Sequence, residues 1–244
     1  PGAVLLLSAG DVLQGRFMSR SDKNRRQAAR DTMRLYERAG YDLGVVGNHE
    51  FDAGPAVLAH ALEGLRSYQF VVSNLKPTGT TLDNSGQRLY RRTVVRSCGG
   101  LKVGFLGLLT PSTRNISNFG DTRFSHPKDP VYPAARIAVA ELRQNGADVI
   151  VALTHLGLKY DLKLAKEVAG IDVIVGGHSH TLLKRWRTVG TTHIVQGGER
   201  FGHLGHLELV GKSGGGLDAN RSTWKVVAIG SEMVSDPPIR QRVN

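Results

Sequence analysis

An apolar run passes directly into polar residues at positions 43–52, where the sequence reads LGVVGNHEFD. The first four residues have the composition of a short buried strand, and an amide, an imidazole and a carboxylate follow on a sharp turn. Polar side chains gathered at such a point belong to a site and not to a hydrophobic core. Because ligands of open α/β sheets gather at the carboxyl ends of the strands, the stretch predicts an α/β fold with its site at this turn.

The same arrangement occurs three more times along the chain. The apolar runs and the polar clusters that follow them are Ala3–Leu7 with Gly10-Asp11, Val149–Leu153 with Thr154-His155, and Ile171–Val175 with Gly176-Gly177-His178-Ser179-His180. An Asp carboxylate can bridge two cations, whereas Asn oxygen and imidazole nitrogen are neutral ligands that suit zinc, manganese or iron. We therefore predict a centre with two divalent metals, which lie roughly 3.5–4 Å apart in such centres and act on a phosphate during in-line displacement. Gly47, Gly176 and Gly177 are expected to permit a positive φ where the chain turns after each strand.

This order of motifs resembles that of the calcineurin-like metallophosphoesterases. The extended form Gly-Asn-His-Glu-Phe-Asp at residues 47–52 is similar to their 5′-nucleotidase and 2′,3′-cyclic phosphodiesterase branch. The resemblance covers nearly the whole chain, since it also includes Leu13-Gln14-Gly15, Ser73-Asn74-Leu75 and Val195-Gln196-Gly197-Gly198. It implies a metal-dependent phosphoric ester hydrolase that releases phosphate from nucleotides by attack of metal-bound hydroxide. The implied cofactors are two divalent ions (Zn, Mn, Fe or Co), and the implied partner is a nucleotide or another small phosphorylated substrate.

The resemblance also implies a role for individual residues. The implied metal ligands are Asp11 as the bridging carboxylate, Asn48, His155 and His178 on the second ion, and His180 on the first. His49 resembles the catalytic histidine beside the scissile phosphate, where it and Asn48 would contact the phosphoryl oxygens, and Asp52 resembles its orienting partner. A carboxylate on one ring nitrogen fixes the tautomer and raises the basicity, which suits an imidazolium that stabilises developing charge or protonates a leaving oxygen.

One family motif is missing from residues 1–244: the Asp-x-His that supplies two further ligands of the first metal. We therefore expect a catalytic domain at residues 1–244 that is truncated at its N-terminus and holds one ion tightly. The C-terminal nucleotide-binding domain of the nucleotidases is expected to be absent as well, because Asp236-Pro237-Pro238 resembles the approach to its connector. Two alternatives stay open, namely a thiosulfohydrolase-like relative that attacks sulfur and a metal-binding fragment without turnover.

Hydrophobic periodicity predicts alternating helices and strands over the first part of the chain. The predicted helices are Asn24–Ala39, Pro55–Leu65, Pro133–Gln144 and Leu162–Val168. The further predicted strands are Gln69–Val72, Tyr90–Val95, Leu101–Leu109, His193–Gln196, Gly205–Val210 and Trp224–Ile229. The alternation indicates an α/β fold, and the strand-rich C-terminal third indicates a second sheet. We expect a two-sheet mixed β sandwich flanked by helices, in four layers, as the resemblance also implies.

Composition and charge agree with one compact domain. The chain has 244 residues, of which 40% are hydrophobic, and a formal net charge of +11. A dense set of Lys and Arg residues at positions 16–34 lacks the aromatic residues that stack on nucleic-acid bases, so the pattern favours a solvated helix face over nucleic-acid binding. The positive field would attract small phosphorylated substrates. The sequence contains no apolar run of about 18 residues, and the family resemblance favours a periplasmic, cell-surface or secreted protein; the oligomeric state stays open.

Overall fold

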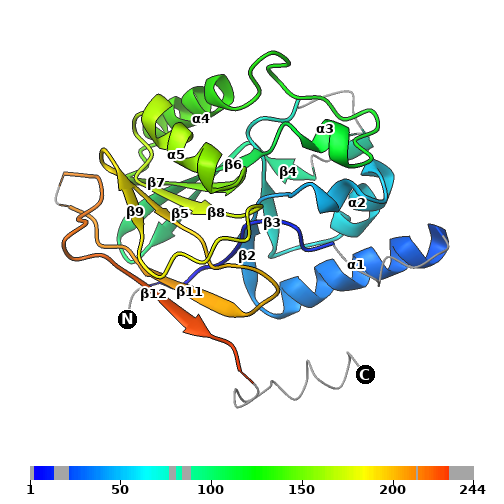
Figure 1. Cartoon of the computed structure of the whole chain (residues 1–244), viewed down its shortest axis with the longest axis horizontal. Coiled ribbons are helices and arrows are strands. Elements are labelled where there is room, and N and C mark those ends of the chain that lie inside the picture. The colour runs from blue at the N-terminus through cyan, green and yellow to red at the C-terminus, as the bar shows by residue number, and fades with distance from the viewer. Residues whose placement is uncertain (1–2, 14–21, 77–80, 84–88, 213, 231–244) are drawn as a thin grey trace.

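A computed structural model describes residues 3–13, 22–76, 81–83, 89–212 and 214–230, and it shows an α/β fold built on two main sheets (Figure 1). The first sheet is parallel and has the order β1 (Leu6–Ser8), β2 (Tyr41–Gly44), β3 (Gln69–Val71) and β4 (Tyr90–Arg91). The second sheet is mixed and has the order β5 (Thr93–Cys98), β6 (Leu101–Leu109), β7 (Val149–His155), β8 (Val173–Gly176), β10 (Thr192–Val195) and β9 (Arg187–Val189). Its four central strands are parallel, and β5 and β9 are antiparallel to their neighbours.

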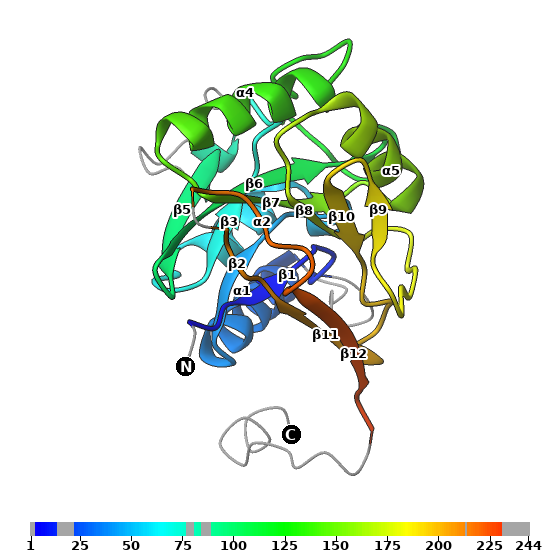
Figure 2. The same cartoon turned by 90° about the vertical axis from the view of Figure 1, so that its left-hand side faces the viewer.

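Helices cover the outer face of each sheet. The first sheet is covered by α1 (Asp22–Arg38) and α2 (Pro55–Leu62), and the second by α4 (Tyr132–Gln144) and α5 (Leu158–Glu167), as Figures 1 and 2 show. Short elements are η1 (His49–Phe51), η2 (Thr81–Asp83) and α3 (Thr113–Ile116). A two-stranded sheet of β11 (His203–Glu208) and β12 (Thr223–Ala228) extends from the side of the molecule away from α4 (Figure 2).

The buried side chains sort into three layers because neighbouring residues of a strand point to opposite faces. On β7, Val149, Val151 and Leu153 face the core between the two sheets, while Ile150 and Ala152 face α4 and α5. The same core between the sheets receives Leu43, Val45 and Val71 from the first sheet. The four-layer α/β sandwich predicted from the sequence is therefore confirmed.

Several predicted boundaries were wrong. The run Tyr90–Val95 was expected to be one strand, but it is broken at Arg92, whose guanidinium turns out to Glu141 on α4. Tyr90 packs in the core of the first sheet and Val94 in the core between the sheets, so the chain crosses from one sheet to the other at this point. The second sheet thus begins at residue 93, well before the C-terminal third of the chain, where it was expected.

The helix ends also differ from the expected ones. The helix expected over Pro55–Leu65 ends at Leu62, because Glu63 is extended and Gly64 has a φ of 77°. The helix expected over Leu162–Val168 begins earlier, at Leu158, after Gly157 with a φ of 88°. Neither β9 nor α3 was predicted, since both are short and carry no periodic apolar pattern.

Candidate metal centre

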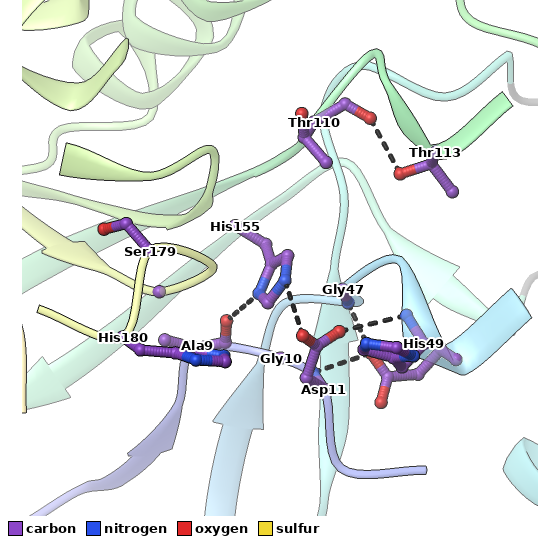
Figure 3. A network of polar contacts seen from close by, with 12 residues as sticks. Ala9, Gly10, Asp11, Gly47, His49, Thr110, Thr113, His155, Ser179 and His180 are labelled. Carbon is purple, nitrogen blue, oxygen red and sulfur yellow. Dashed lines mark hydrogen bonds and ion pairs between the residues drawn. The ribbon is translucent and has the colours of Figure 1, made fainter. Parts of the chain in front are cut away.

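The four polar clusters meet where the two sheets adjoin. The loops after β1 and β2 bring Asp11 and Asn48-His49 from the first sheet. His155 is the last residue of β7, and His178 lies on the loop after β8, so the second sheet contributes both imidazoles. All four strands present their carboxyl ends here, which is where ligands of parallel sheets bind. Figure 3 shows one residue of each cluster in this region, namely Asp11, His49, His155 and His180.

Asp11, His155 and His178 form a group with the geometry of a cation site. Their ligand atoms all lie within 4.8 Å of one another, and Asp11 Oδ2 is 3.0 Å from His155 Nε2. The Nδ1 of His155 donates a hydrogen bond to the carbonyl oxygen of Ala9 at 2.7 Å, so Nε2 of the neutral ring would turn a lone pair toward the Asp11 carboxylate (Figure 3). Two acceptors facing each other at this distance need a proton or a cation between them.

Asn48, on the loop after β2, carries an acceptor without a partner. Its side chain is buried, and its Oδ1 has no hydrogen-bond partner among the described residues. A buried amide oxygen without a partner is costly, and a cation would satisfy it. Oxygen from Asp and Asn together with imidazole nitrogen is a donor set that suits zinc, manganese, iron or cobalt, so the residues present fit a divalent metal.

The charges in the group respond to one another. Burial alone would lower the pKa of His155, but the hydrogen bond and the charge of Asp11 raise it above the ordinary value. Burial would raise the pKa of Asp11, yet His155 holds it below the usual range. Burial lowers the pKa of His178, and the neighbouring His155 adds to the effect. His155 and Asp11 thus favour a shared proton, and a divalent ion bound between them would displace it.

His49 and Asp52 form the predicted pair. His49 Nδ1 lies 2.5 Å from Asp52 Oδ2, because one turn of η1 places residues three apart on the same side. The backbone N–H of His49 donates to Asp11 Oδ1 at 3.0 Å, which fixes the pair beside the cation group. Burial would lower the pKa of His49, but the hydrogen bond to Asp52 and the charges of Asp11 and Asp52 raise it. Both side chains are 41% exposed, so a substrate can reach the ring.

His180 lies apart from the group that Asp11 forms with the other two histidines. Its Nδ1 is 3.2 Å from Glu199 Oε2, and its side chain is half exposed. Glu199 was not singled out from the sequence, where it follows the Gly197-Gly198 pair without a recognisable motif. An acceptor on Nδ1 leaves the Nε2 of His180 as the nitrogen available for a ligand.

The expected reason for the glycines of the turns was wrong. Gly47, Gly176 and Gly177 do not have a positive φ; instead Asp11, His178 and His180 themselves do, with values of 59°, 73° and 55°. The glycines are needed for space. A Cβ on Gly47 would lie 2.2 Å from Asp11 Oδ1, one on Gly176 would lie 2.4 Å from Asp161 Oδ2, and one on Gly177 would lie 2.6 Å from the Ala9 carbonyl oxygen.

Gln196 supports the loop that carries His178 and His180, and Asp161 supports Thr154 at the end of β7. Gln196 Oε1 accepts hydrogen bonds from Ser179 Oγ at 3.0 Å and from Thr181 N at 2.5 Å, and its Nε2 donates to the Gly177 carbonyl. The sequence analysis recognised the motif Val195-Gln196-Gly197-Gly198 but assigned no role to Gln196. Asp161 accepts from Thr154 Oγ1 at 2.7 Å, and burial raises its pKa to about 7. No sequence motif marked Asp161, which lies just before the predicted helix.

Comparison with known proteins agrees with this geometry. The family described as bacterial capsule synthesis protein PGA_cap matches residues 13–195. A snake venom 5′-nucleotidase from Gloydius brevicauda is 33% identical over 180 residues, which cover 74% of this chain and 29% of the venom protein. The crystal structure of a 5′-nucleotidase precursor from Thermus thermophilus has a TM-score of 0.85 at 33% identity and covers 99% of this chain and 48% of that chain. The sulfate thiohydrolase SoxB of Thermus thermophilus has a TM-score of 0.81 over 98% of this chain and 41% of that chain, but at 23% identity it shows the fold alone.

The chain therefore belongs to the PGA_cap family, and its fold is that of a calcineurin-like phosphoesterase from Bacillus subtilis, with a TM-score of 0.76 at 22% identity. Over most of its length it is similar to 5′-nucleotidases, as the venom and Thermus relatives show. The family resemblance inferred from the sequence is confirmed. The chain spans less than a third of the venom protein and about half of the Thermus protein.

Proposed function

We propose that the chain is a metal-dependent phosphoric ester hydrolase of the 5′-nucleotidase type, which releases phosphate from nucleotides. The observation that carries the proposal is the convergence of Asp11, His155 and His178, and the buried, partnerless Oδ1 of Asn48 supports it. The similarity to 5′-nucleotidases over most of the chain supports the same reaction class. We also propose that residues 1–244 form one such domain.

Each residue of the group has a distinct task in this proposal. Asp11, Asn48, His155 and His178 would hold one divalent ion, and Asp11 with His180 would bind the other. Bound ions would supply Lewis acidity, which would lower the pKa of a water at the site and neutralise charge on the phosphoryl oxygens. His49 and Asn48 bind the phosphoryl oxygens from the side of η1. His49 also carries a proton that the Asp52 carboxylate stabilises, and it gives this proton to the nucleoside oxygen as that oxygen leaves.

The number of ions follows from the ligands. Asp11, His155 and His178 lie together, and with Asn48 they would give one ion four ligands, whereas among the proposed ligands only Asp11 and His180 would serve the other. We therefore propose that one equivalent of zinc, manganese, iron or cobalt is held tightly and a second one weakly.

The surroundings of the site favour small anionic substrates. The net charge of +11 raises the local concentration of phosphorylated molecules, and we propose a nucleotide rather than a nucleic acid as the partner. We also propose that the protein is exported to the periplasm, the cell surface or the medium, which the venom relative supports. Among the helices of the described residues, none has both the length and the apolar character needed to cross a bilayer.

The test is phosphate release from a panel of 5′-nucleotides and 2′,3′-cyclic nucleotides after treatment with a chelator and addition of Mn²⁺, Zn²⁺ or Co²⁺. We expect release only with metal present, and loss of it in a His178→Asn variant. A thiosulfate ester assayed in parallel tests the sulfur alternative, which no feature of the described residues favours. A protein that binds Co²⁺ but hydrolyses none of these substrates would be a metal-binding module, and the proposal would be wrong.

A further inference from the structure

We infer that Glu50 is the positioning residue of the metal centre: its buried carboxylate fastens the Asp11 loop to the Asn48-His49 loop and so sets the position in which Asp11 meets a cation. The inference rests on the proposed function only through that cation. Glu50 lies within the motif Gly-Asn-His-Glu-Phe-Asp at residues 47–52, but neither the sequence analysis nor the geometry of the ligands assigned it a role.

The hydrogen bonds of Glu50 are unusual in number and origin. The residue is 2% exposed, and its Oε2 accepts the backbone N–H of Asp11 at 2.9 Å and that of Gly47. Its Oε1 accepts the N–H groups of Val12 at 2.5 Å and Leu13 at 2.9 Å. One carboxylate therefore satisfies four backbone donors from two loops that are far apart in the sequence. Hydrogen bonds to a charged acceptor are roughly twice as strong as neutral ones.

The Asp11 loop needs such a support because its backbone is strained. Asp11 has a φ of 59°, which residues with a side chain rarely adopt, and Gly10 before it has a φ of 90°. No strand or helix holds residues 9–13, so their N–H groups depend on other acceptors. Glu50 provides these acceptors, and it does so for three successive residues, which pins both the place and the direction of the chain.

The position of Asp11 in turn decides where its two oxygens point. Oδ1 receives the N–H of His49 at 3.0 Å, and Oδ2 faces Nε2 of His155 at 3.0 Å. Because Glu50 also binds the N–H of Gly47, the residue before Asn48, one side chain fixes the ligands from both loops of the first sheet. Both oxygens of Glu50 are occupied by backbone donors, so Glu50 positions the ligands and is not itself one of them.

Amide hydrogen exchange tests the fastening in the metal-free chain. Glu50→Gln keeps the shape but replaces one acceptor oxygen by an NH₂ group, which faces backbone donors that it cannot satisfy. We expect the amides of Asp11, Val12, Leu13 and Gly47 to be protected together in the parent protein and to exchange at least tenfold faster in the variant. Rapid exchange of these amides in the parent protein would overturn the inference, whether or not the protein binds metal.

Titration with Co²⁺ then tests the positioning itself. We expect Glu50→Gln to weaken Co²⁺ binding by about 10–100-fold, as the loss of a partner of a metal ligand usually does, and to change the visible spectrum of the bound ion. Glu50→Asp, which keeps the charge on a shorter stem, should recover part of the affinity. If Glu50→Gln does not fold, the exchange of the parent and of Glu50→Asp decides the question.

Glu37 offers a matched control at the opposite end of the strands of the same sheet. Its Oε1 accepts the N–H groups of Arg66 at 2.5 Å, Ser67 at 2.6 Å and Tyr68 at 3.4 Å, just before β3 begins. Glu37→Gln removes the same kind of support without touching the centre, and it should leave Co²⁺ affinity and spectrum unchanged. Equal Co²⁺ binding by Glu50→Gln and the parent would overturn the inference. A parent that binds no Co²⁺ would instead refute the proposed function, and hydrogen exchange would still decide the role of Glu50.

Discussion

Replacing Gly47 by alanine would place one methyl group between the candidate metal ligands. The new Cβ would lie 2.2 Å from Asp11 Oδ1, 2.6 Å from Asp11 N and 2.8 Å from His155 Cε1. Comfortable contacts between such atoms need about 3.5 Å, so Asp11 must retreat by roughly 1 Å or more. Gly47 does not have a positive φ, so the substitution adds volume without a conformational penalty of its own.

Two magnitudes follow from this crowding. An extra methyl group in a packed region costs about 1–3 kcal/mol in the free energy of unfolding, and each kcal/mol lowers Tm by about 2–4 °C in a protein of this size. A displacement of about 1 Å at a site residue can reduce turnover about 10²-fold. We therefore expect Gly47→Ala to remain folded, to melt several degrees lower, and to lose most of its metal affinity and phosphate release.

The assays are thermal unfolding with and without Mn²⁺, equilibrium dialysis against Zn²⁺, and phosphate release from a nucleotide. Gly197→Ala is the matched control, because Gly197 also lacks a positive φ and has space for a methyl group. The atom nearest to the new Cβ would be the backbone nitrogen of Gly205, at 3.9 Å. The control should behave like the parent protein. If Gly47→Ala melted at the parent temperature and bound Zn²⁺ equally well, the close approach of Gly47 to Asp11 would not be what the centre requires.

Three further predictions concern the site residues. Dialysis of the metal-loaded chain should leave one equivalent of ion, and two tightly held equivalents would contradict the ligand count. His49→Asn should reduce phosphate release by about 10²–10⁴-fold while the bound metal is retained, whereas His178→Asn should lose both; metal analysis beside rate measurements would show a reversal of these roles. Asp52→Asn should slow turnover by about 10–100-fold. In its pH–rate profile, the decline in rate at alkaline pH should begin at a lower pH than in the parent protein. The sign follows because Asp52 raises the pKa of His49, so its loss lowers the pH at which the proton leaves; an unchanged pH–rate profile would make Asp52 a mere turn residue.

The sequence predicted the location of the site better than it predicted the site's construction. Apolar runs followed by polar clusters predicted that Asp11, Asn48, His155 and His178 would meet, because the carboxyl ends of parallel strands share an edge. It could not predict the break at Arg92, since Tyr90 and Val94 both read as strand residues and only the packing of two separate cores distinguishes them.

Sequence patterns could not predict the contacts within the loops. The glycines after the strands were recognised, but the need for space around Asp11 depends on a neighbour that is distant in sequence. Three of the four hydrogen bonds of Glu50 likewise go to residues that lie 37 to 39 positions away in the sequence. The fourth goes to its near neighbour Gly47. The acceptors of a loop without regular structure carry no periodicity, so only coordinates reveal them.

A metal ion bound where the two sheets adjoin would also stabilise the fold. Asp11 and Asn48 come from one sheet and His155 and His178 from the other, and the hydrogen bond between His155 and Ala9 already closes a loop of 146 positions. A cation at this point would join both sheets through a single atom. An ion at about 100 times its Kd adds roughly 2.7 kcal/mol to the free energy of unfolding. The metal supply of the surroundings would then govern how long the protein survives heat and proteases, as well as how fast it turns over.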